Sequence, residues 1–67
     1  MSTAAVHLLD YEFHRARCVA SRRLAGRFAN EGRNDLSHAH AAFGAIFELC
    51  ADFALKIAHR KLQEEGR

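Results

Sequence analysis

Apolar side chains recur at helical spacing in two long stretches that a short polar segment separates. In the second stretch two columns repeat every seven residues, one of Leu36, Phe43, Cys50 and Ile57 and one of Ala39, Ile46 and Phe53. In the first stretch the apolar positions are three or four residues apart and comprise Val6, Leu9, Phe13, Ala16, Ala20, Leu24 and Phe28. Spacings of three and four are typical of amphipathic helices, and a sustained seven-residue repeat is typical of a coiled-coil-like seam. The pattern predicts two helices, at about residues 4–31 and about residues 36–64.

Turn-forming residues cluster between the two stretches, at positions 30–35. Gly32 is expected just beyond the first helix, because glycine adopts the left-handed conformation without a Cβ penalty. The candidate N-caps are Ser2 or Thr3 for the first helix and Asp35, Ser37 or Asn34 for the second. A turn as short as 32–35 makes the helices antiparallel neighbours. Residues 1–67 are therefore predicted to form a single all-α helical-hairpin domain.

The apolar surface of the second stretch is wider than one partner helix can cover. The first helix should bury the seven-residue repeat and leave much of Phe47, Leu49 or Leu55 exposed, and exposed patches of that size indicate association. A two-fold dimer forming a four-helix bundle would cover them and enlarge the small core of a 67-residue chain. The alternative is a monomer whose apolar flank binds a different partner. The residues predicted for the core or the dimer interface are Leu9, Phe13, Leu24, Phe28, Phe43, Ile46, Phe47, Cys50, Phe53 and Ile57.

The opposite side of the first helix combines aliphatic and charged residues. Its members are Leu8, Glu12, Arg15, Val19, Arg22 and Arg23. Two aliphatic side chains ringed by arginines are typical of a protein-binding hot spot. The competing interpretation is a solvated face with two incidental apolar residues.

Charge is uneven along the chain, with five arginines and no acidic residue between Phe13 and Asn30. A nucleic-acid interface that uses Arg15, Arg22, Arg23 and Arg27 is the alternative to a protein-binding face. The net charge is only +2, and no aromatic side chain is interleaved on the arginine face to stack on bases, with Tyr11 near one end of it. Both observations favour a protein partner.

Composition and motifs limit the remaining classes. An apolar content of 49% without proline excludes a disordered chain, and 67 residues are too few for a deep catalytic cleft. No catalytic triad, paired carboxylates or glycine loop occurs, so we expect no enzyme activity and no cofactor. The five histidines lack the four-residue spacing of a helical metal pair, so no metal site is expected.

The two cysteines and the apolar content bear on the compartment. Two cysteines make no disulfide framework; Cys50 is expected as a buried free thiol, with Cys18 rotated off the seam. The chain has no run of 18 apolar residues and no basic, apolar leader at its start. We therefore expect a cytoplasmic protein without a membrane association.

Two groups of small helical proteins share this outline. The plasmid copy-number RNA-binding protein Rop is a dimer of helical hairpins of similar length, but its RNA-holding faces are not reproduced here. In length, alanine- and arginine-rich composition and two-helix pattern, the chain resembles the small phage-encoded helical-hairpin inhibitors of host regulators, which include an anti-quorum-sensing protein. The resemblance covers the whole chain in outline, without a diagnostic motif, and no functional residue carries over. It implies an anti-activator in the host cytoplasm that binds the DNA-binding domain of a LuxR-type regulator and inhibits the type IV pilus assembly ATPase.

Overall fold

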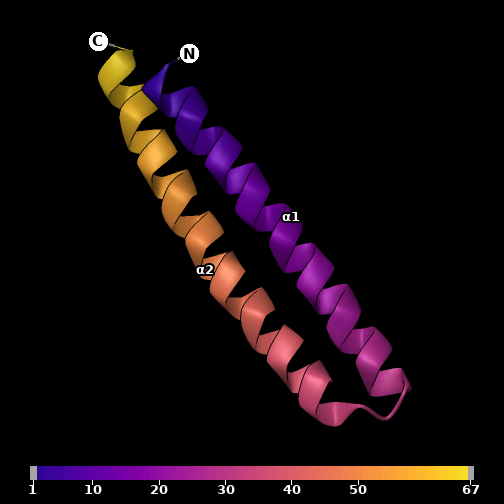
Figure 1. Cartoon of the computed structure of the whole chain (residues 1–67). Helices are drawn as coiled ribbons and strands as arrows, with labels where there is room; N and C mark the ends of the chain where they lie inside the picture. The colour runs from indigo at the N-terminus through magenta and orange to yellow at the C-terminus, as the bar shows by residue number, and fades with distance from the viewer. Residues whose placement is uncertain (1, 67) are drawn as a thin grey trace.

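The computed structural model describes residues 2–66 and consists of two antiparallel helices. Helix α1 (Thr3–Asn30) and helix α2 (Asn34–Glu65) lie side by side, with both chain ends at one end of the molecule and the turn at the other (Figure 1). The hairpin is elongated, with extents of 54 × 16 × 10 Å. The predicted all-α hairpin is confirmed, and each helix begins and ends within two residues of its expected position.

The end of α1 follows the sequence prediction in detail. Gly32 has φ +74°, the left-handed conformation expected of it. The Gly32 amide donates to the Ala29 carbonyl at 3.0 Å, and the Arg33 amide donates to the Phe28 carbonyl at 2.8 Å. These two bonds form a Schellman motif, which satisfies carbonyls that the helix end would otherwise leave free. At the other end of α1, Ser2 is the N-cap and its Oγ accepts from the Ala5 amide at 3.1 Å.

The start of α2 differs from the prediction. Its N-cap is Arg33, which makes no side-chain capping bond, so neither Asp35, Ser37 nor Asn34 is the cap. Ser37 instead donates its hydroxyl to the Ala25 carbonyl of α1 at 2.8 Å, because it faces α1 from the first turn of α2. Asp35 lies in the first turn of α2, where its carboxylate interacts favourably with the positive end of the helix dipole.

Small residues fill the contact between the helices. The buried residues are Ala4, Cys18, Ser21 and Ala25 on α1 and Gly44, Ala51, Ala54 and Ala58 on α2. Positions 4, 18 and 25, like positions 44, 51 and 58, are separated by multiples of seven residues, so each set stays on one side of its helix. We call these eight residues the small-residue seam. Because their side chains are short, the two backbones approach closely: a Cβ added at Gly44 would lie 3.6 Å from the Cys18 carbonyl oxygen.

The prediction that α1 covers the large apolar repeat of α2 was wrong for the single chain. Phe43, Ile46 and Phe53 are 47%, 53% and 68% exposed, and Phe13 on α1 is 58% exposed. Leu9 and Cys50 are also exposed, and Leu24, Phe28, Phe47 and Ile57 are half-buried. None of the ten residues predicted for the core or dimer interface is buried within one chain.

The burial of the two cysteines is the reverse of the prediction, for the same reason. Cys18 is fully buried in the small-residue seam and Cys50 is exposed beside it. The prediction assigned the contact to the apolar residues that recur every seven positions, whereas the small side chains one position later in α2 are the ones that admit a close helix approach.

Candidate protein-binding face

The small-residue seam divides the remaining surface of the hairpin into two sides. Residues that directly precede a seam position lie on one side, and residues that directly follow one lie on the other, because each step turns the helix by about 100°. Contacts across the helices confirm this division. Arg22 pairs with Glu48 on the following side, and Arg17, on the preceding side of α1, places its guanidinium over the ring of Phe47, a residue of α2 that faces α1.

The residues predicted to bind a partner gather on the following side. Leu8, Glu12, Arg15, Val19 and Arg22 each come directly after a position that faces α2, and Arg23 lies next to them at the outer edge. Leu8 is 36% exposed, Val19 is half-buried, and the charged members are exposed. The structure therefore brings these six residues to one side of α1, and we call this surface, with the α2 residues described next, the partner face.

Helix α2 extends the partner face with residues that the sequence analysis did not include. Glu48, Leu55 and Leu62 follow seam-facing positions of α2 and so share its side. Leu62 is 49% exposed and Leu55 is half-buried, so aliphatic surface continues from α1 onto α2 near the open end of the hairpin. Their seven-residue spacing is the signal that could have found them, because it places all three on one side of α2. The antiparallel turn then brings Leu62 to the end of the hairpin where Leu8 lies and Glu48 beside Arg22.

The ion pair between Arg22 and Glu48 links the two helices across the partner face. Both side chains are about half exposed, so solvent screens the pair and its contribution to stability is small. The pair mainly fixes the position of Arg22, because it holds this side chain against α2. Arg15 and Arg23 have no acidic side chain within 4 Å among residues 2–66, which leaves their guanidinium groups available to an incoming carboxylate.

The preceding side carries the large apolar residues. We call this surface the apolar face, and its apolar members are Val6, Phe13, Ala20, Leu24, Leu36, Ala39, Phe43, Ile46, Cys50, Phe53 and Ile57. Aromatic contacts connect it to the edge of the seam: the Phe43 and Phe47 rings stack at 6.4 Å, and the Arg17 guanidinium lies 3.9 Å from the Phe47 centroid. Arg17 also lies 5.2 Å from the Phe13 centroid. The rings attract the Arg17 cation, so its guanidinium is held against the apolar face.

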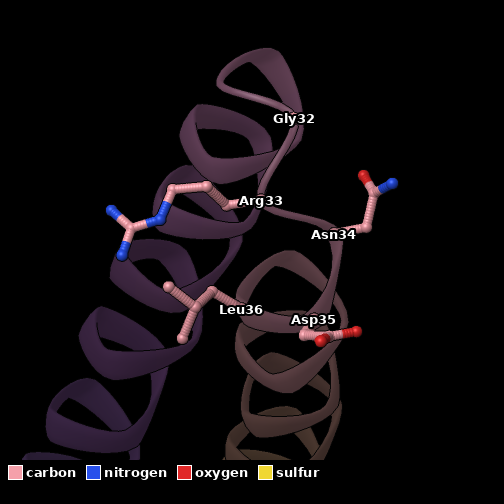
Figure 2. A pocket seen from close by; sticks show the side chains of 5 residues that line it. All are labelled: Gly32, Arg33, Asn34, Asp35 and Leu36. Carbon is pink, nitrogen blue, oxygen red and sulfur yellow. The ribbon is translucent and has the colours of Figure 1, made fainter.

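Metal-ligating side chains are dispersed over residues 2–66. No group of three or more His, Cys, Asp or Glu side chains lies close enough to hold a metal ion within residues 2–66. A hollow at the turn is lined by Gly32, Arg33, Asn34, Asp35 and Leu36, but Figure 2 shows the Arg33 and Leu36 side chains on one side of the turn and those of Asn34 and Asp35 on the other. Its polar groups do not converge on a common point.

Helices α1 and α2, as described, both lack a segment apolar enough to cross a bilayer. Comparison of the chain with protein-family models, with curated proteins and with solved structures found no match. The candidate function therefore depends on the two faces alone.

Proposed function

We propose that this chain is a small non-enzymatic inhibitor that acts as a homodimer and binds a regulatory protein through the partner face. The observation that supports it is the grouping of Leu8 and Val19 with Arg15, Arg22 and Arg23 on one side of a rigid helix. Aliphatic side chains bordered by arginines favour a protein surface that offers apolar pockets next to carboxylates.

The proposed target is the DNA-binding domain of a LuxR-type quorum-sensing regulator, as the resemblance to phage anti-activators implies. Covering the surface that reads DNA or dimerises is enough to block DNA binding, and no catalytic step is required. Mimicry of DNA is not the proposed mode, because a mimic needs a strongly acidic surface and this chain has a net charge of +2. The same resemblance makes the type IV pilus assembly ATPase a second proposed target.

Competition with operator DNA tests this proposal. Purified LuxR-type DNA-binding domains are mixed with their labelled operators, and the chain is titrated into the complexes. We expect the wild type to release the DNA and the double variant Val19→Asp/Arg22→Glu to be at least tenfold weaker. Lys56→Glu is the matched control, because it reverses one charge on α2 outside both faces. Failure of the wild type to release any operator, or equal potency of the double variant, would contradict the proposal.

A Rop-like RNA- or DNA-binding regulator is the second candidate, and the exposed Arg15 and Arg23 are what favour it. The four arginines predicted for this candidate, the two exposed ones together with Arg22 and Arg27, do not share a face. At about 100° per residue, Arg27 points roughly 140° away from Arg22. Binding through phosphates is steeply salt-dependent. A gel shift with structured RNA and duplex DNA at low salt tests this candidate, and it is rejected if no shift occurs.

A further inference from the structure

The chain exposes more surface than a compact monomer of 67 residues would. The chain has an accessible surface of 4897 Å², whereas a folded monomer of this mass exposes about 4,250 Å². The excess, roughly 650 Å², approaches the ~800 Å² that each partner contributes to a standard protein interface.

The interior of the hairpin cannot compensate for that exposure. Its buried apolar residues are five alanines and Cys18, so little apolar area leaves the solvent when the helices pack. The large side chains that normally stabilise a domain lie on the apolar face instead, with Phe13, Ile46 and Phe53 each more than half exposed. Folding therefore depends on an occupant that covers this face.

We infer that the occupant is a second copy of this chain, packed face to face with its turn at the opposite end from the first. In this arrangement α2 lies against the partner's α2, and α1 against the partner's α1. The inference deepens the homodimer of the proposed function, and it does not depend on which regulator the partner face binds.

The composition of the two helices selects this orientation. On α2, all residues of the preceding side between 36 and 57 are apolar. The preceding side of α1, by contrast, includes Asp10, Arg17 and Arg27. With the turns at opposite ends, the apolar helix meets its own counterpart and the charged helix meets its own. With the turns at the same end, Asp10 and Arg17 would both lie against the partner's apolar α2 with no polar group beside them, which is costly, whereas with the turns at opposite ends the α1 charges stay together and only Arg17 meets its own counterpart.

The spacing of side chains along each helix also fits a two-fold axis at mid-length. Phe13 and Ala20 lie equally far from the midpoint of α1 (Thr3–Asn30), so the axis brings each phenylalanine over the small residue of the other copy. Ile46 and Phe53 are equally far from the midpoint of α2 (Asn34–Glu65), so the axis brings each Phe53 over the Ile46 of the other copy. Cys50 lies next to that midpoint, so the two copies of Cys50 meet at the axis.

Cross-linking through Cys50 tests the arrangement with the apolar face unaltered in the test chain. In a Cys18→Ala chain, Cys50 is the sole thiol, and mild oxidation or a short bis-maleimide should convert most of the protein to a double-mass species. The matched control is Cys18→Ala/Cys50→Ser/Ala45→Cys, which places an exposed thiol of α2 on the opposite side and should not cross-link efficiently. A dimer in sedimentation that cross-links no better through Cys50 than through the control cysteine would overturn the orientation.

A pair of matched charge substitutions tests the face itself. Ile46 and Leu62 are both on α2 and are 53% and 49% exposed, but only Ile46 belongs to the apolar face. Ile46→Glu should weaken the dimer at least a hundredfold in sedimentation, or unfold the chain at micromolar concentration, and Leu62→Glu should leave it dimeric. Monomeric wild-type protein with a melting temperature independent of concentration would overturn the inference. Operator release through the partner face is a separate measurement, so the inhibitor proposal and this dimer fail independently.

Discussion

Two glycines of the hairpin differ in backbone conformation, and this difference decides how well each position tolerates a side chain. Gly32 has φ +74° and ends α1, whereas Gly26 lies within α1 and has ordinary helical geometry. A Cβ added at either position would meet no atom within 4 Å. Steric contact is therefore absent at both, and only the conformational preference of the backbone differs.

We predict that alanine substitutions at these two glycines change stability in opposite directions. Gly26→Ala should stabilise the protein by about 0.5–1 kcal/mol, because alanine loses less backbone entropy in a helix interior. Gly32→Ala should destabilise it by about 1–2 kcal/mol, because an L side chain is strained at positive φ. Denaturant unfolding at one fixed protein concentration measures both values. Changes of the same sign would show that the turn can adopt another conformation at no cost.

At the scale of the helix, the small-residue seam sets how closely α1 and α2 approach. Ala51 is 1% exposed and faces α1, so a larger side chain there has no room unless the helices separate. Ala45 lies on the same helix but is exposed on the following side. The two alanines differ in position and not in local helix propensity, which makes them a matched pair.

Ala51→Leu should destabilise the hairpin by about 1–3 kcal/mol through overpacking. Ala45→Leu should change the free energy of unfolding by no more than about 0.5 kcal/mol, as is usual for surface substitutions. Circular dichroism during denaturant unfolding measures both effects. Equal effects of the two substitutions would mean that the seam is not the contact between the helices.

At the scale of the whole molecule, Arg17 is the charged residue closest to the inferred two-fold axis. It lies next to the midpoint of α1, so the Arg17 residues of two copies approach each other, while each guanidinium stacks on Phe13 and Phe47 of its own chain. Two like charges near a desolvated centre oppose association, and apolar replacements of such groups are often stabilising.

Arg17→Met is therefore predicted to tighten the dimer about tenfold, equivalent to 1.4 kcal/mol. Arg23→Met is the control, since Arg23 is exposed outside the apolar face and should leave the dissociation constant unchanged. Sedimentation equilibrium of both variants gives the comparison. A weaker Arg17→Met dimer would show that the guanidinium binds an acidic group of the other copy.

The sequence by itself determined the local features of this protein. Helical spacing, absent proline and the glycine at the turn are signals carried by neighbouring residues, so they specified two helices, their limits and the left-handed Gly32. The same spacing placed Leu8, Arg15, Val19 and Arg22 on one side of α1, because helix geometry alone decides which residues share a side. These predictions required no knowledge of what α1 packs against.

Only the tertiary structure decided which side of each helix faces the other. Helix α2 offers two stripes at seven-residue spacing, one that includes Phe43, Cys50 and Ile57 and one of small residues at 44, 51 and 58, and periodicity does not distinguish them. The sequence analysis took the recurring apolar stripe as the contact, but the contact uses Ala25, Gly44 and Ala51, whose short side chains permit the closer approach of the backbones. Because the helices pack through these small residues, Cys18 is buried, Cys50 is exposed, and Leu55 and Leu62 belong to the partner face. Contacts across 30 or more residues depend on packing, which local spacing does not encode.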